Sequence, residues 1–162
     1  LEGSLDNLNS GRDLKRGREM FHVALCIRCH RLGGEGATFG PDLSAVGSRF
    51  GRRDLLEAIL VPSKVIDDKY RATLIETSDG RTIAGLIVGG DAESVYVASN
   101  ALDPTQVEKV KKADIEAQQP SLVSPMPTGL VDTLTKEELL DLLAYLESTA
   151  QPQPPPGAAG GN

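Results

Sequence analysis

The chain has few aromatic residues, no tryptophan and only two cysteines among its 162 residues. Aromatic residues make up 4% of it, so large rings cannot dominate its interior as they do in most domains of this length. Two cysteines are too few for the disulfide framework of a small secreted domain. No apolar run approaches the roughly 20 residues that span a bilayer, so we expect no membrane-spanning segment.

Positive charge is scarce as well. Lys and Arg number 17 against 23 Asp and Glu, which gives a net charge of -6. Nucleic-acid-binding proteins usually need a clustered basic face, so nucleic acid is excluded as the main partner.

Three stretches have the apolar spacing of a helix face and predict helices over 11–25, 52–60 and 136–148. Capping-box spacing marks the start of the first and the last, at Ser10–Asp13 and Thr135–Glu138. Between the second and the third helix the period changes to that of strands, and Asp79-Gly80 is a strong hairpin-turn signal. We expect an antiparallel meander or barrel of four or five short strands there. Their predicted ranges are 70–77, 82–88, 94–98, 107–110 and 114–116.

The two cysteines form the motif Cys26-Ile27-Arg28-Cys29-His30 at the end of the first predicted helix. Two thiols at this spacing can add to the two vinyl groups of one haem, and the next residue, His30, is then held beneath the iron as the proximal ligand. A covalently held haem also compensates for the shortage of aromatic side chains. A redox dithiol is a weaker interpretation because no βαβ pattern surrounds the motif. A zinc site needs three or four ligands, and only His22 and acidic residues remain to complete one.

The second axial ligand is sought among Met20, His22 and Met126. Met20 and His22 lie on the helix that leads into the motif, whereas the far face of the haem needs a separate segment. Met126 lies in a proline-stiffened loop, Ser124-Pro125-Met126-Pro127, just before the last helix. This placement favours Met126, and a thioether ligand suits electron transfer because it favours ferrous iron.

Two further features point to the haem. A proximal histidine needs a hydrogen-bond acceptor for its second ring nitrogen, and a carbonyl of the loop containing Gly40-Pro41 is the natural candidate. Arg49, Arg52 and Arg53 are candidate partners for the haem propionates.

The order of these motifs resembles that of class I c-type cytochromes, in which the first and last helices cross through a contact between glycine and aromatic residues. The residues that carry it are Gly17, Phe21, Cys26-xx-Cys29-His30, Gly40-Pro41-Asp42-Leu43, Met126-Pro127 and Leu142-xx-Tyr145. The chain is still more similar to the haem-binding domain of large secreted proteins of planctomycetes and verrucomicrobia. That similarity covers about 10–149 and includes Cys29-His30-Arg31-Leu32, Leu55-Leu56-Glu57-Ala58-Ile59-Leu60-xx-Pro62-Ser63 and Ser124-xx-Met126-Pro127-xx-Gly129-Leu130. It implies that the domain ends a multidomain chain.

Met126 lies much further from His30 than is usual in class I cytochromes, and the surplus coincides with the strand region. We therefore expect a mainly α fold, a class I cytochrome c core of about three helices interrupted by a small antiparallel β insert, α+β overall. The predicted parts are a flexible segment 1–9, a domain 10–150 with core 10–69 and 119–150 and insert 70–118, and a Pro/Gly-rich tail 151–162.

The motif and the resemblance together predict a one-electron carrier, not an enzyme, with one haem c per chain and with His30 and Met126 on the iron. The expected partner is a redox protein or a fused dehydrogenase domain, and haem attachment of this kind implies a periplasmic or otherwise extracytoplasmic compartment. Two alternatives stay open. Without Met126 the iron is five-coordinate and binds small gases or peroxide, or the β insert is a protein-interaction module and the haem is structural.

Overall fold

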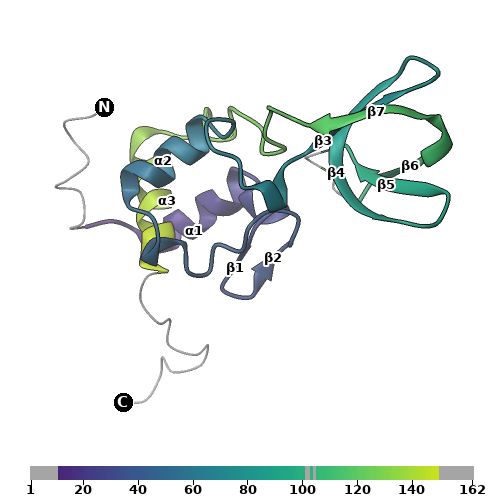
Figure 1. The fold of residues 1–162 in the computed structure, drawn as a ribbon. Helices are drawn as coiled ribbons and strands as arrows, with labels where there is room; N and C mark the ends of the chain where they lie inside the picture. The colour runs from purple at the N-terminus through teal and green to yellow at the C-terminus, as the bar shows by residue number, and fades with distance from the viewer. Residues whose placement is uncertain (1–10, 101–102, 104, 150–162) are drawn as a thin grey trace.

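The structure is a computed structural model that describes residues 11–100, 103 and 105–149. The segment 1–9, Ser10 and the tail 151–162 lie outside the described residues. The α-helices gather at one end of the molecule and a five-stranded sheet forms the other end (Figure 1). The helices are α1 (Leu14–Val23), α2 (Arg52–Leu60) and α3 (Lys136–Ser148), with short 3₁₀ turns η1 (Cys26–Arg28), η2 (Val46–Ser48), η3 (Asp68–Tyr70) and η4 (Lys112–Asp114). The strands are β1 (Arg31–Leu32), β2 (Glu35–Gly36), β3 (Thr73–Thr77), β4 (Thr82–Gly90), β5 (Ser94–Ala98), β6 (Val107–Lys111) and β7 (Ile115–Pro120).

The prediction of a mainly α fold is wrong. The described residues are 32% helical and 25% strand, with three α-helices and seven strands in two antiparallel sheets. Strands β4 and β7 run longer than their sequence patterns indicated. A further small hairpin, β1–β2, forms directly after the Cys26–His30 motif, where Gly33 and Gly34 turn the chain at φ +60° and +91°. None of the described helices has both the length and the apolar character needed to cross a membrane.

The helix predictions were more accurate. Helices α2 and α3 have the predicted bounds, and the capping box at the start of α3 is present, with Thr135 N donating to Glu138 at 2.7 Å and Glu138 N donating to Thr135 Oγ1 at 3.3 Å. Helix α1 is shorter than predicted. It begins after Asp13, whose carboxylate accepts from Arg16 N at 2.9 Å, and the chain then breaks at Leu25, which adopts a left-handed φ of 60°.

Helices α1 and α3 cross in direct contact at Gly17. A Cβ atom on Gly17 would lie 2.2 Å from the carbonyl oxygen of Asp141 and 2.7 Å from Cβ of Tyr145, so a larger residue would push the helices apart. One turn further along α1, the Phe21 and Tyr145 rings meet edge to face with centroids 6.2 Å apart. Around this crossing lies the core of the helical part, whose buried members include Met20, Ala24, Leu32, Leu55, Ile59, Leu142, Leu143 and Leu146.

The five-stranded sheet has the order β6-β5-β4-β3-β7, and every neighbouring pair is antiparallel. Asp79-Gly80 makes the predicted hairpin turn between β3 and β4, with Gly80 at φ +80°. The sheet has a small buried core of its own, which consists of Ile75, Ile83, Val97 and Val110. Because β3 and β7 pair side by side, the chain leaves the helical part and returns to it at nearly the same place (Figure 1).

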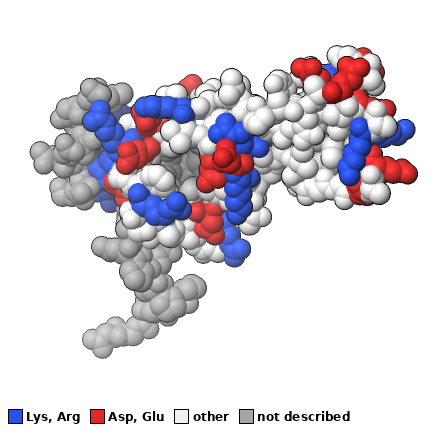
Figure 2. All heavy atoms as spheres, in the orientation of Figure 1, with Lys and Arg blue, Asp and Glu red and all other residues white. Residues whose placement is uncertain are grey.

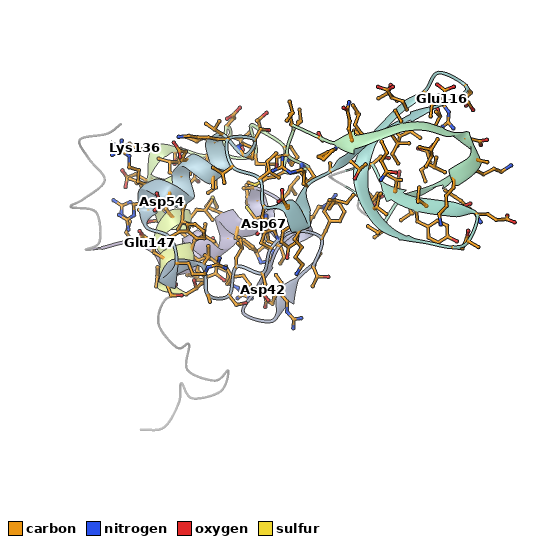
Figure 3. The ribbon with its side chains drawn as sticks, in the orientation of Figure 1. Asp42, Asp54, Asp67, Glu116, Lys136 and Glu147 are labelled. Atoms are coloured by element: carbon orange, nitrogen blue, oxygen red, sulfur yellow. The ribbon has the colours of Figure 1, made fainter. Side chains whose placement is uncertain are left out.

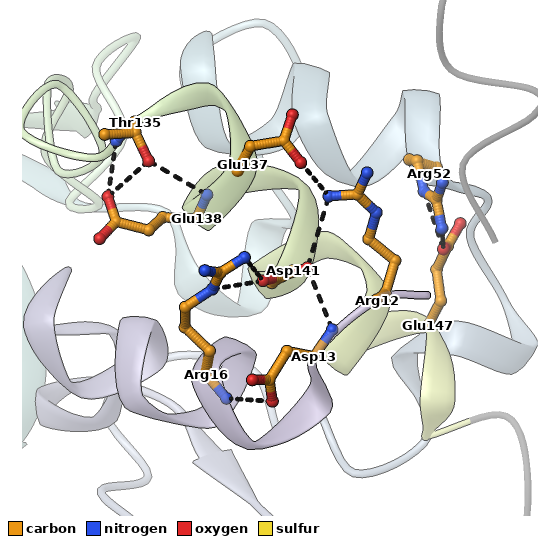
Figure 4. Close-up of polar contacts among 9 residues, drawn as sticks. All are labelled: Arg12, Asp13, Arg16, Arg52, Thr135, Glu137, Glu138, Asp141 and Glu147. Atoms are coloured by element: carbon orange, nitrogen blue, oxygen red, sulfur yellow. Dashed lines mark hydrogen bonds and ion pairs between the residues drawn. The ribbon is translucent and has the colours of Figure 1, made fainter. Parts of the chain in front are cut away.

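A buried carboxylate ties the start of α1 to α3 (Figure 4). Asp141 is 1% exposed and accepts hydrogen bonds from Arg16 Nε at 2.6 Å, Asp13 N at 3.2 Å and Arg12 Nη1 at 3.4 Å. The bond to Asp141 raises the pKa of Arg16. Arg12 also bonds Glu137 on the surface at 2.7 Å. Both oxygens of the buried carboxylate thus have donors from α1 or from the two residues before it.

We predict that Asp141→Asn lowers the free energy of unfolding by about 2–3 kcal/mol, because the charged donors lose the negative charge of their buried partner and one of its two acceptor oxygens. Glu137→Gln is a matched control on the same helix with the same Arg12 partner. Its side chain is 60% exposed, so its loss stays below about 1 kcal/mol. Chemical denaturation of both variants measures the difference, and equal losses would contradict the assignment.

Candidate functional site

The Cys26–His30 motif folds as a compact turn directly after α1. The left-handed Leu25 redirects the chain, and η1 then carries Cys26 to Arg28. His30 N donates to the carbonyl of Cys26 at 2.8 Å, and Cys29 N donates to the same carbonyl at 3.1 Å. The two thiols and the imidazole therefore come from one short hydrogen-bonded turn whose orientation is set by α1.

The thiols of this turn are not joined in a disulfide, and both are partly buried. Burial raises the pKa of Cys26 to about 12 and also raises the pKa of Cys29. A redox dithiol depends on a lowered thiol pKa, so this environment does not support that interpretation. Within residues 11–100, 103 and 105–149, no three His, Cys, Asp or Glu side chains cluster as a zinc site would require.

The His30 ring is held in one orientation. Its Nδ1 lies 2.8 Å from the carbonyl oxygen of Pro41, which is the contact expected from the Gly40-Pro41 loop. Burial lowers the pKa of His30, which favours the neutral form of the ring. A neutral ring that donates Nδ1–H to a carbonyl keeps the lone pair on Nε2, the atom that a metal binds.

The loop that supplies this carbonyl is fastened to the motif by backbone hydrogen bonds. Gly40 N donates to Cys29 O at 2.7 Å, and Ala37 N donates to Ile27 O at 3.1 Å. A Cβ atom on Gly40 would lie 2.8 Å from Cε1 and 3.0 Å from Nδ1 of His30, so the ring lies against bare backbone. The sequence pattern singled out Pro41, but it contained no sign of this close contact.

Met126 lies partly buried against the same core as Cys26. Its backbone N donates to Ser124 Oγ at 3.1 Å, so the loop around it is ordered by a local turn. The other two candidate ligands are placed as their positions on the first helix suggested. Met20 is buried in the helical core, and His22 is exposed beside the Phe21 ring.

The structure separates the arginine candidates. Arg52 is buried and paired with Glu147 of α3, with Arg52 Nε 2.9 Å from the carboxylate, so it joins α2 to α3 (Figure 4). Arg49 is exposed, and its guanidinium lies 5.5 Å from the centre of the Phe50 ring. Of these two, only Arg49 presents its charge at the surface.

Comparison with known proteins agrees with this geometry. Residues 14–86 match the family described as cytochrome c. A stretch of 55 residues is 38% identical to one of the subunits of nitric oxide reductase from Halomonas halodenitrificans, over 34% of this chain and 37% of that protein. The match thus spans little more than a third of that relative's length. A cytochrome c match implies covalently bound haem c and haem-based electron transfer, and Met126 lies beyond the matched residues.

We predict that Gly40→Ala displaces the His30 ring and lowers the free energy of unfolding by about 1–3 kcal/mol, because the new methyl group overlaps the ring. The Nδ1 resonance of His30 in ¹⁵N NMR reports the displacement. Gly89→Ala is the control, since its Cβ would meet only the Tyr96 ring at an ordinary 3.5 Å. A Gly40→Ala protein with an unmoved resonance would show that the loop does not hold the ring.

Proposed function

We propose that this chain is a one-electron carrier in which Cys26 and Cys29 hold haem c and His30 and Met126 bind its iron. The observation that carries the proposal is the His30 ring, fixed by Pro41 with Nε2 left to bind a metal. The donor set also fits the group. It comprises two thiols three residues apart that form no disulfide, an imidazole whose pKa is lowered by burial, and a partly buried thioether on the same core as Cys26.

Each residue has a separate task in this function. When bound, the haem supplies reversible one-electron chemistry at iron. The Pro41 carbonyl makes His30 a better electron donor by accepting its Nδ1–H. Met126 favours the ferrous state and raises the reduction potential. Arg49 is the proposed partner of a propionate, because its guanidinium is exposed.

We further propose that the domain is not itself an enzyme and serves a redox protein or a fused dehydrogenase domain. The relative in Halomonas is by name one subunit of nitric oxide reductase, which supports a role beside a partner. The need for attachment of haem to reduced thiols supports a periplasmic or otherwise extracytoplasmic location. The motifs shared with the haem-binding domain of secreted planctomycete and verrucomicrobial proteins support the same compartment.

Covalent attachment is the first testable consequence. Protein expressed with a haem-attachment system should keep its colour after denaturation and acid extraction, and mass spectrometry should show the added mass of one haem per chain. The Cys26→Ala/Cys29→Ala double variant should release any haem on extraction. Colourless wild-type protein with unmodified mass would rule out the proposed function.

Met126 is tested by Met126→Ala, which should retain the haem but lose the methionine-to-iron charge-transfer band at the red edge of the ferric spectrum. Its potential should fall, because the preference of the thioether for ferrous iron is lost, and cyanide should bind readily. Met20→Leu is the matched control. It keeps the core volume, costs less than about 1.5 kcal/mol and leaves band and potential unchanged. A wild-type protein without the band would favour five-coordinate iron that binds gases or peroxide.

A further inference from the structure

The five-stranded sheet is joined to the helical part through a short neck, which we define as residues 66–72 and 120–124. Figure 3 shows Asp67 at this junction and Glu116 in the sheet beyond it. Strands β3 and β7 pair from Thr73 opposite Pro120, and Ser121 N donates to Ala72 O at 2.8 Å. The outgoing and returning chains are thus bonded together where they meet the helices. Met126 follows the returning chain after only a few residues.

Arg71 holds both sides of the neck. Its Nη2 donates to Ile66 O at 3.0 Å and its Nη1 donates to Ser121 O at 3.3 Å, while Nε pairs with Asp68 at 3.0 Å. The side chain is 26% exposed, whereas its Asp68 partner is 93% exposed. The two bonds to carbonyl groups are therefore better shielded from solvent than the ion pair with Asp68. They use two nitrogens of the planar guanidinium group, which lysine lacks.

From the neck, a series of serine hydrogen bonds runs to Met126. Ser121 Oγ lies 3.0 Å from both Val123 N and Val123 O. Ser124 N donates to Ser63 Oγ at 3.0 Å, which anchors the segment to the loop after α2. Ser124 Oγ in turn accepts from Met126 N at 3.1 Å.

The two apolar side chains of this segment are not buried. Leu122 is 85% exposed and Val123 is 68% exposed, so the two apolar residues between the neck and Ser124 contribute little packing. Figure 2 shows an uncharged surface between the charged helical end and the charged far end of the sheet. Because Leu122 and Val123 pack so little, the approach to Met126 is ordered mainly by the hydrogen bonds of Arg71, Ser63 and Ser124.

We propose that Arg71 and Ser63 are positioning residues that present the Met126 thioether to the iron, so that the neck of the sheet belongs to the support of the distal ligand. This inference rests on the proposed function. It departs from our expectation of an insert separate from the haem core. The five-stranded sheet retains its own core, but the neck, where the chain enters and leaves the sheet, sets the position at which the Met126 loop begins.

The test uses the full chain with haem attached. Imidazole is titrated into the ferric protein, where it competes with Met126 for the iron. Its apparent affinity therefore rises when Met126 is held less firmly. We expect about tenfold tighter imidazole binding and a weakened red-edge band for Arg71→Lys, which loses the fork. We expect about fivefold tighter binding for Ser63→Ala, which loses one neutral hydrogen bond. Ser63→Thr keeps the hydroxyl and should behave as wild type.

Matched controls are Arg81→Lys, whose partners Asp79 and Glu108 lie in the sheet, and Ser48→Ala, whose hydroxyl bonds Ala45 O. Both should leave imidazole affinity unchanged, and thermal unfolding checks that all variants are folded. If Arg71→Lys and Ser63→Ala also leave affinity and band unchanged, the neck does not position Met126. If the wild type itself lacks the band, the His30/Met126 assignment fails, and this inference fails with it.

Discussion

The contact of α1 with α3 at Gly17 is the constraint on which the site depends. The Cys26–His30 turn follows α1 directly, and the Met126 loop precedes α3, so the crossing places both candidate ligand segments on one core. The approach is possible only because Gly17 has no side chain to meet Asp141 and Tyr145. Hydrogen bonds from the start of α1 to the buried Asp141 then prevent the two helices from sliding or rotating against each other. The position of the Cys26–His30 motif is therefore set by contacts at the opposite end of α1.

The shortage of aromatic residues has a consistent structural explanation. Two rings, Phe21 and Tyr145, are used at the helix crossing, where shape matters most. The other members of the helical core are aliphatic residues and methionine, and the sheet core contains only isoleucine and valine. Two small cores need fewer large side chains than one large core would. The division into two cores follows from the chain, which changes from helical to strand period and back.

Much of the fold could be predicted from the sequence, because apolar period and turn residues are local signals. The bounds of α2, α3 and β5 and the turn at Asp79-Gly80 all follow from such patterns. The β1–β2 hairpin was missed because its strands are two residues long and have no period to detect. The mainly α classification failed because α1 is shorter than predicted, the β1–β2 hairpin adds strand residues, and β4 and β7 continue to Gly90 and Pro120, beyond their predicted ends.

The candidate site, too, could be predicted only in part. The bond from His30 to a carbonyl of the Gly40-Pro41 loop could be predicted, because a metal-binding imidazole needs an acceptor and the loop is close in sequence. The roles of Ser63 and Arg71 could not. Ser63 bonds a backbone N 61 residues away, and Arg71 bonds a carbonyl 50 residues away. Every residue has a backbone N–H or carbonyl, so the sequence does not show which distant backbone group a side chain will bond.

The neck also explains how a whole sheet fits between α2 and the Met126 loop. The entropic cost of closing a loop grows only slowly with its length, so a long excursion is tolerated if its ends are brought together. The pairing of β3 with β7 does this, and Arg71 and the Ala72–Ser121 bond fasten the two ends to each other. Strands β4, β5 and β6 lie outside the neck, so the two ends are joined without them. A change at the neck, in contrast, is passed through Ser121 and Ser124 to Met126, because the segment between them has no buried side chain to absorb it.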